Sequence, residues 1–401
     1  MIHFKGLYLY SFLAKFRNKF PRNFRKISFK VQNILNYLIF FIFLPSKIYF
    51  ERKIKFNQLK NSFINKVIIR NDKLGDCALT LPFIYGTLGK NKNLFYVSEI
   101  SKEIIDQLKI KCIWKSSKYS NNNKDLIVAN LSTSEINSFK RDLPSKTKPI
   151  IFTQFSTEPF SKNGFPIIFS PNYLKNKSQT LFVRSSFNML GIKSDPIKGI
   201  KLLNSNLFKI IGGKKNNILV IVVGLGIDIG RQLSTNNINE IIKFAKERDL
   251  KPVILEEPGH EKRLKRLAQE KNIESRSCKN FLELFTLFKI SRYAVGYDCG
   301  PMHIASLLTN SIILFSHTPS FHWGRHIWHK FIFKRTLTNK SSSIIITKQL
   351  NLGSLKYNWI IFSDQKGCPL HKKTCNDNRC SELNKDLLKK SIEFVLKNQK
   401  N

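Results

Sequence analysis

Short apolar runs alternate with helix-forming segments along most of this chain, and this alternation is the strongest constraint on its fold. The runs KVIIR at 66–70 and NILVIVVG at 217–224 are almost continuously apolar, which is typical of strands buried on both faces of a parallel sheet. Further strands are expected at 94–98, 125–130, 149–152, 166–170, 252–257, 293–297 and 311–316. Helices are expected at 77–88, 178–190, 236–248, 259–271, 281–290, 301–308 and 383–396. The alternation therefore predicts two α/β domains with parallel sheets.

A turn-rich and basic stretch between residues 191 and 217 separates the two blocks of alternation. We therefore expect an N-terminal domain at 61–205 and a C-terminal domain at 206–401, preceded by an extension at 1–60. Ligands of such folds bind beyond the carboxyl ends of the strands. The loops that matter for function are then 71–76, 224–235, 256–260, 297–303 and 316–329.

The chain is strongly basic, with 68 Lys and Arg against 27 Asp and Glu, a net charge of +41. This excess predicts a polyanionic partner: an anionic membrane surface, a phosphorylated glycan or a nucleic acid. Residues 1–50 carry nine Lys or Arg and no acid, with aromatic residues between them and an apolar run at 34–44. A solvated tail and a nucleic-acid-binding arm are alternatives, but the apolar run favours an anionic membrane surface, so no nucleic-acid partner is expected.

The apolar run at 34–44 has 11 residues, fewer than the roughly 18 that a membrane-spanning helix needs. Seven cysteines, an odd number, do not indicate a disulfide framework. We therefore expect a cytoplasmic protein.

An aspartate follows the first expected strand in the turn NDKLGD, at 71–76. Asp76 is a candidate general base for a sugar hydroxyl, and Gly75 leaves room for a substrate. A simple helix N-cap satisfies the same spacing, and on spacing alone it is the better interpretation.

The segment GYDCGPMHIA at 296–305 predicts a strand, a turn and the start of a helix at Pro301. Free N–H groups and the helix dipole make such a start suitable for an anion. His303 would lie near the same anion, and Asp298 is a candidate acceptor for ribose hydroxyls. The alternative is a structural turn capped by Asp298.

Three cysteines lie near the C-terminus at Cys368, Cys375 and Cys380, with His371 between the first two. Their gaps are wider than the usual spacing of structural zinc ligands, so buried thiols are favoured and no metal site is predicted.

These segments together resemble glycosyltransferase family 9, the lipopolysaccharide heptosyltransferases. The resemblance rests on IIRNDKLGDCALTLP, on GYDCGPMHIASLL, on SHTPSFHWG at 316–324 and on the cysteine-bearing tail, in that order, and covers the chain from about Val67 onward. It implies a GT-B fold, in which two Rossmann-like domains face a cleft. It also implies inverting transfer of heptose, without a metal or other cofactor, from an ADP-heptose-like donor to a phosphorylated, lipid-linked core oligosaccharide at the inner face of the inner membrane.

The resemblance also implies roles for individual residues. Asp76 would be the catalytic base, and Asp298 would hold the ribose. Apart from the resemblance, Lys73 lies three residues before Asp76 and is a candidate contact for an acceptor phosphate, with simple solvation equally open. The donor diphosphate would be bound by Cys299, Gly300, Met302 and His303, and by Arg231 in the loop after the first C-domain strand. Glu257 or its neighbour Glu256 would face the donor.

The chain departs from the family pattern in its donor half. Cys299 stands where the family has a threonine, and Val223, Gly224 and Leu225 replace the usual His-Pro-Gly. The segment RQLS at 231–234 replaces a K-x-W-P run. Two alternatives therefore stay open: a GT-B enzyme with another donor and surface glycan, and a catalytically degenerate module that binds membranes or nucleic acid.

Overall fold

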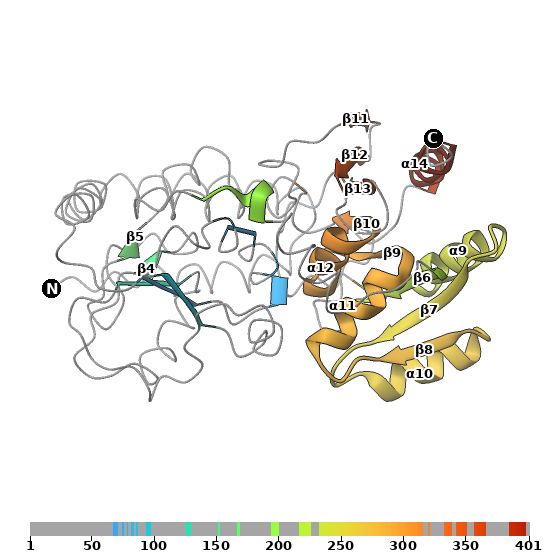
Figure 1. Ribbon diagram of the computed structural model, residues 1–401. Helices are drawn as coiled ribbons and strands as arrows, with labels where there is room; N and C mark the ends of the chain where they lie inside the picture. Colours follow the sequence, from blue (N-terminus) through green and yellow to red (C-terminus); the bar gives the residue numbers. More distant parts are fainter. Residues whose placement is uncertain are drawn as a thin grey trace, which may run out of the picture.

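The computed structural model describes two parallel-stranded regions of the chain. The described residues are 67–70, 74–75, 78, 82–83, 86, 94–97, 126–129, 151–152, 167–168, 194–199, 216–225, 232–315, 320, 333–338, 342–350, 357–365 and 385–397. The first region is a parallel three-stranded sheet of order β2-β1-β3, with β1 at Val67–Arg70, β2 at Leu94–Val97 and β3 at Leu126–Ala129. Two short strands, β4 at Ile151–Phe152 and β5 at Ile167–Ile168, pair in parallel beside it (Figure 1).

The second region is an eight-stranded sheet of order β11-β12-β13-β10-β9-β6-β7-β8. Its strands are β6 (Asn216–Val222), β7 (Lys251–Glu256), β8 (Glu274–Ser277), β9 (Ser291–Tyr297), β10 (Asn310–Phe315), β11 (Phe333–Thr338), β12 (Ser342–Leu350) and β13 (Tyr357–Gln365). The six strands from β8 to β13 along this order are parallel, whereas β12 pairs antiparallel with both β11 and β13.

Helices cover both faces of this sheet. They are α9 (Thr235–Lys246), α10 (Glu261–Glu270), α11 (Phe281–Ile290), α12 (Gly300–Leu308) and α14 (Lys385–Lys397). The connections from β6 to β7 to β8 run one way across the sheet and those from β8 to β9 to β10 run back. Right-handed crossovers then place α9 and α10 on one face and α11 and α12 on the other.

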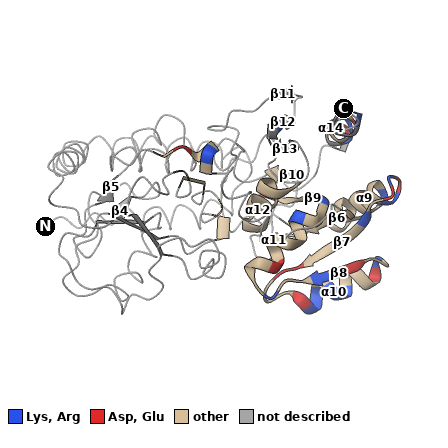
Figure 2. Cartoon of the chain, in the orientation of Figure 1, with Lys and Arg blue, Asp and Glu red and all other residues tan. Residues whose placement is uncertain are grey.

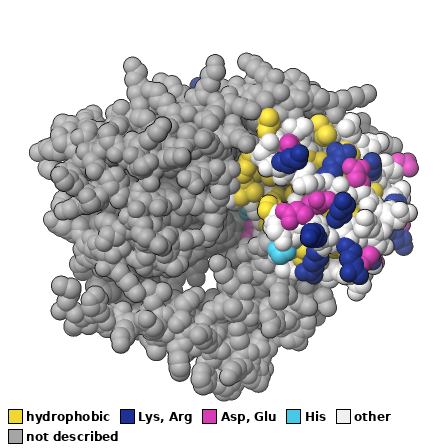
Figure 3. Space-filling view, turned by 90° about the horizontal axis from the view of Figure 1, so that it is seen from below, with side chains coloured by type: hydrophobic (Ala, Val, Ile, Leu, Met, Phe, Trp, Pro, Cys, Tyr) yellow, Lys and Arg dark blue, Asp and Glu magenta, His cyan; other side chains and the backbone are white. Residues whose placement is uncertain are grey.

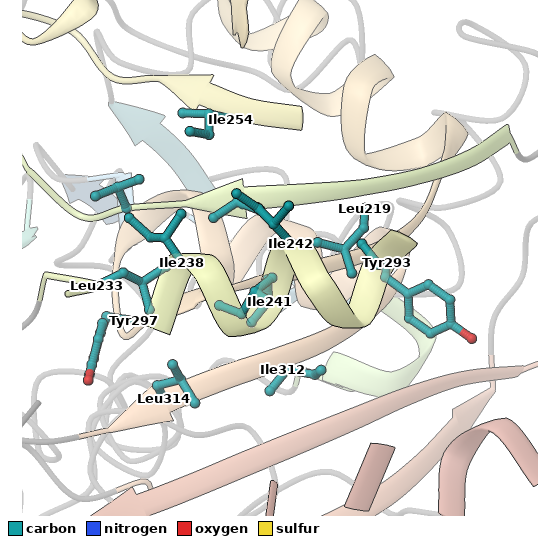
Figure 4. Close-up of a cluster of buried hydrophobic side chains, with 14 of the residues drawn as sticks. Leu219, Leu233, Ile238, Ile241, Ile242, Ile254, Tyr293, Tyr297, Ile312 and Leu314 are labelled. Carbon is teal, nitrogen blue, oxygen red and sulfur yellow. The ribbon is translucent and has the colours of Figure 1, made fainter. Parts of the chain in front are cut away.

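The core lies between α9 and the middle of this sheet. Ile238, Ile241 and Ile242 recur at helical spacing on α9 and pack against Leu219 of β6 and Leu314 of β10 (Figure 4). The Ser234 side chain caps this helix by accepting from the Asn237 N–H at 3.2 Å. α14 adds to the same core, where Phe394 packs edge to face on Trp359 of β13.

The fold class predicted from the sequence is confirmed. Most expected strands are present within a residue or two of their predicted bounds, and α11 occupies the expected range of 281–290. The expected helix at 178–190, the domain boundary at 205/206 and the extension at 1–60 lie outside the described residues.

Other expectations need correction. β8 and β11 to β13 were not expected, and a purely parallel C-terminal sheet is wrong because β12 is antiparallel to its neighbours. α12 begins at Gly300, one residue earlier than expected, and Leu74 and Gly75 are already helical although a turn was expected through residue 76. Among the described helices, none is long and apolar enough to cross a membrane.

Candidate active site

The order of the parallel strands locates the candidate site. Numbered along the chain from β6, the strands run 3-2-1-4-5-6 across the sheet, the doubly wound order. Successive strands are added toward one edge of the sheet from β6 to β8 and toward the other edge from β9 onward, so the strand order reverses between β6 and β9. Ligands of such sheets bind in the crevice outside the carboxyl ends at that reversal. The loops after β6 and β9 flank this crevice.

The N-terminus of α12 opens directly onto the crevice. Cys299 is its N-cap, in extended conformation, and its side chain makes no capping hydrogen bond to the helix. Pro301 occupies the first turn, where its missing N–H and fixed φ favour a helix start. Without a side-chain cap, the first N–H groups and the positive end of the helix dipole remain directed at a ligand position.

A glycine in β9 allows α12 to approach the sheet closely. A Cβ atom on Gly296 would lie 2.7 Å from the Val222 carbonyl oxygen and 3.1 Å from Met302 Cγ. Met302 is fully buried. Its side chain therefore packs into the core, and any contact it makes with a donor would come from its backbone.

Asp298 and His303 form a buried pair at the same point. His303 Nε2 lies 2.9 Å from Asp298 Oδ1, and the two residues are 4% and 2% exposed. The Asp298 N–H donates to the Leu314 carbonyl oxygen at 2.8 Å, which anchors the turn to β10. The carboxylate thus fixes the orientation of the imidazole. A contact between Asp298 and a ribose stays a prediction, because Oδ1 is engaged by His303.

The helical residues Leu74 and Gly75, which follow β1, pack on the beginning of α12. A Cβ atom on Gly300 would lie 2.7 Å from both Cβ and Cγ of Leu74, and one on Gly75 would lie 3.5 Å from His303 Cδ2. These two backbone segments are therefore in contact although 225 residues separate Gly75 from Gly300. Asp76 follows Gly75 directly and itself lies outside the described residues.

Glu257 and Glu256 point to different parts of the sheet. Glu257 Oε1 accepts from the Gly224 N–H at 2.5 Å, and the residue is 7% exposed. Gly224 has φ of 85°, a conformation that favours glycine, so the turn after β6 depends on it. Glu256 Oε1 instead accepts from Ser275 Oγ at 2.6 Å, toward the sheet edge. Of the two candidates, Glu257 is therefore the one beside the crevice.

A further pair at the carboxyl edge was not found from the sequence. Asp364, near the end of β13, accepts from the Ser320 N–H at 2.5 Å through Oδ1 and from Ser320 Oγ at 2.6 Å through Oδ2. Burial raises the pKa of Asp364, the two bonds from Ser320 lower it, and the charge of Asp298 raises it further. A polar residue that ends the apolar run at 359–362 was the available signal, but β13 itself was not expected.

The remaining predicted residues lie outside the described part of the chain. They are Lys73, Asp76, Arg231, Cys368, Cys375 and Cys380. Close to Arg231 in the chain, the Leu233 N–H donates to the Val223 carbonyl oxygen at 2.9 Å. Within the described ranges, no group of three or more His, Cys, Asp or Glu side chains is placed to hold a metal ion.

Comparison with known proteins gives matches only among solved structures. No protein-family model matches the sequence, and no curated protein is similar. The structure of E. coli heptosyltransferase WaaC with ADP aligns with a TM-score of 0.51 at 12% identity, over 82% of this chain and 99% of that one. The fold is that of the family 9 heptosyltransferases.

Other solved structures align less closely with this GT-B chain. A family 9 glycosyltransferase from Veillonella parvula gives a TM-score of 0.44 at 13% identity, over 65% of this chain and 83% of that one. The E. coli ADP-heptose LPS heptosyltransferase II gives 0.42 at 9% identity, over 64% and 86%.

Proposed function

We propose that this GT-B protein is an inverting glycosyltransferase that moves a heptose, or a related sugar, from a nucleotide-diphosphate donor to a lipopolysaccharide core. The observation that carries the proposal is the contact of Gly75 with His303 and Gly300. In this contact, Gly75, the residue directly before the candidate base Asp76, lies against the start of α12, which is the candidate diphosphate site. ADP-heptose is the first donor to test, because the solved WaaC structures contain ADP and an ADP-heptose analogue.

The proposed reaction is a single displacement. Asp76 accepts the proton of an acceptor hydroxyl while that oxygen attacks the anomeric carbon. The bond from this carbon to the diphosphate oxygen breaks on the opposite face, and the nucleoside diphosphate leaves with the electron pair. The α12 N–H groups, His303 and Arg231 stabilise the charge that develops on the diphosphate, in place of a metal ion. Attack and departure on opposite faces invert the configuration.

The donor half supports a second candidate, a GT-B transferase with another nucleotide sugar and another surface glycan. Cys299 offers no hydroxyl to a phosphate, and its side chain forms no capping bond with α12. The Glu257 carboxylate binds the Gly224 N–H in a turn that differs from the family pattern. These residues set donor choice, so a binding panel of ADP-, UDP-, GDP- and CMP-sugars by calorimetry distinguishes the two candidates.

We also propose that the protein meets its acceptor at the cytoplasmic face of the inner membrane. Acidic and basic side chains are interspersed on the described surface of the C-terminal domain (Figures 2 and 3). Residues 216–315 carry 14 Lys and Arg against 11 Asp and Glu, a net charge of +3. The excess of +41 therefore lies mainly elsewhere in the chain, and residues 1–50 hold nine bases without an acid. Such an extension favours anionic lipid and a phosphorylated, lipid-linked acceptor.

The substitution Asp76→Asn tests the chemistry. It keeps the size of the side chain but removes the base, so transfer falls by a factor on the order of 100 or more. Binding of the nucleotide sugar by calorimetry stays unchanged. Asp72→Asn, which removes the same charge from the same turn, is the control and retains transfer. Undiminished transfer by the Asp76 variant would show that the base is assigned wrongly, whereas nucleotide binding without any transfer by the unmodified protein would favour a degenerate binding module.

A further inference from the structure

The helix α10 presents a cluster of basic side chains to solvent. Leu264 and Ala268 are buried, so this side of the helix faces the sheet, where α10 packs on β7 and β8. The bases lie within five consecutive residues and are all exposed (Figure 2). We call them the α10 basic face: Lys262, Arg263, Lys265 and Arg266.

The net charge of residues 216–315 is concentrated in this helix. Residues 261–271 have five Lys or Arg and two Glu, a net charge of +3, whereas the remainder of 216–315 has nine bases and nine acids. Arg266 pairs with Glu270 at 3.0 Å. Among the described residues, no carboxylate forms an ion pair with the other three bases of the α10 basic face.

This arrangement is unfavourable for the helix itself. The dipole favours acids in the first turn and bases in the last, but Lys262 and Arg263 lie in the first turn beside Glu261, and the last turn has no base. Lys262 is also four residues from Arg266, a spacing at which like charges repel. In α9, by contrast, both bases lie in the last turn. A charged face that weakens its own helix indicates a partner that supplies negative charge.

The α10 basic face lies at the same edge of the sheet as the crevice. β7 ends at Glu256 and α10 begins at Glu261, so the helix starts at the carboxyl ends of the strands. The His260 N–H donates to the Glu257 carbonyl oxygen at 3.0 Å, and the Glu257 carboxylate accepts from the Gly224 N–H beside the crevice. One tight turn therefore joins the crevice to the start of α10.

An anionic lipid bilayer fits this surface better than a nucleic acid does. The face is the exposed outer side of a helix on β7 and the edge strand β8, where a broad surface can reach it. Long Lys and Arg side chains suit a layer of anionic headgroups. Residues 257–273 contain no Phe, Tyr or Trp, whereas proteins that bind single-stranded nucleic acid use aromatic side chains to stack on the bases.

We propose that the α10 basic face docks on the surface of an anionic lipid bilayer. This contact is made by the C-terminal domain and is additional to the one proposed for residues 1–50. It holds the carboxyl edge of the sheet, and with it the crevice, close to the membrane. The consequence for catalysis rests on the proposed function, because a lipid-linked acceptor then lies within reach of the crevice.

The first test measures lipid binding by the full chain. One variant combines Lys262→Gln, Arg263→Gln, Lys265→Gln and Arg266→Gln, and it is sedimented at low salt with vesicles of equal parts phosphatidylcholine and phosphatidylglycerol. Because every base near anionic lipid adds to the attraction, binding falls by about tenfold or more. A control variant loses four exposed bases at the opposite edge of the sheet and binds like the unmodified protein: Lys334→Gln, Lys389→Gln, Lys390→Gln and Lys397→Gln.

Two further measurements exclude other causes of a loss. Glutamine is a good helix former, so the urea midpoint of the α10 variant does not fall below that of the unmodified protein, and weaker binding then reflects charge and not unfolding. Binding to an oligonucleotide is compared in parallel. A variant that loses oligonucleotide binding but keeps vesicle binding would identify nucleic acid as the partner and would overturn the inference.

Sugar transfer distinguishes this inference from the proposed function. The α10 variant loses rate when the acceptor is embedded in the same vesicles but not when the acceptor is dispersed in detergent. Equal vesicle binding by the α10 variant and the unmodified protein would overturn the inference and leave the proposed function intact. Absence of transfer by the unmodified protein with every nucleotide sugar would overturn the proposed function, whereas weaker vesicle binding by the variant would still support the docking surface.

Discussion

Gly300 allows the residues that follow β1 to approach the start of α12 closely. Its missing side chain leaves space for Leu74, since a Cβ atom there would meet Leu74 Cβ and Cγ at 2.7 Å. Gly300→Ala therefore separates the turn that carries Asp76 from α12. Because displacements of about 1 Å in an active site cost on the order of 100-fold in rate, kcat in a transfer assay falls by about that factor.

A rescue experiment distinguishes this steric effect from damage to α12. Adding Leu74→Gly to Gly300→Ala removes the contacting atoms and restores part of the lost kcat. Nucleotide binding by the single Gly300→Ala variant, measured by calorimetry, falls less than kcat. An alanine variant as active as the unmodified protein would mean that Leu74 and Gly300 are not in contact during catalysis.

Asp364 makes the stability of the C-terminal domain depend on pH. Burial is the main reason that its folded-state pKa lies above the usual value of 3.8, so the folded protein holds this proton more tightly than the unfolded chain. The protonated carboxyl group therefore contributes to the free energy of unfolding, and this contribution is fully present below about pH 3.8. It is lost as pH rises from about 3.8 through the raised pKa. The urea midpoint of the unmodified protein, relative to that of Asp364→Asn, is expected to fall between pH 4 and pH 7. A constant difference across this range would contradict the expectation.

The sequence predicted which motifs meet, but it did not predict how their side chains pair. Asp298 and His303 lie five residues apart, and only the turn into α12 brings Nε2 onto Oδ1. The sequence did not distinguish Glu256 from Glu257 as the residue that faces the donor. The structure distinguishes them by their hydrogen bonds, because Glu257 accepts from Gly224 and Glu256 accepts from Ser275. Asp364 was missed because its partner lies 44 residues away in the chain.

At the scale of single elements, α11 is held at its start by reciprocal capping bonds. Asn280 Oδ1 accepts from the Glu283 N–H at 2.9 Å, and Glu283 Oε2 accepts from the Lys279 N–H at 2.8 Å. Asn280→Ala removes the first bond, so the free energy of unfolding falls by about 1 kcal/mol. Urea denaturation measures this loss. Lys279→Ala, which keeps the backbone N–H, serves as control and changes stability by less than about 0.5 kcal/mol.

The expected strands are those with a strong apolar run, and the missed strands β8 and β11 lack one. β12 and β13 were missed although they contain the apolar runs 344–346 and 359–362. β6, β9 and β10 are buried on both faces and read as continuous apolar runs. β8 has the sequence ESRS, which is polar throughout because it is the edge strand. β11 and β12 extend the opposite edge, where FKRTLT shows little apolar periodicity.

At the scale of the whole molecule, the sheets are arranged so that ligand-facing loops converge. The turn after β1 and the start of α12 both follow carboxyl ends of parallel strands, and they touch through Gly75 and His303. In the proposed reaction, each sheet supplies one half of a two-substrate site, and this contact brings the motif near residue 75 together with the one near residue 300.

Basic residues are distributed unevenly along the chain, and the extension at 1–60 is the part whose membrane binding we test. Deleting residues 1–50 removes nine bases and the apolar run at 34–44. Since each base near anionic lipid contributes about 1 kcal/mol, binding to phosphatidylglycerol-containing vesicles at low salt falls by at least about tenfold. Sedimentation with the vesicles measures this loss.

A second variant distinguishes membranes from nucleic acid as the partner of the extension. Phe40→Ser with Phe41→Ser keeps every base but interrupts the apolar run. Vesicle binding weakens in this variant because less apolar surface enters the lipid, whereas binding to an oligonucleotide, which depends on the bases, does not change. Equal vesicle sedimentation by the deletion variant and the full chain would assign the membrane contact, if any, to the remaining basic residues, and the extension would then have no anchoring role.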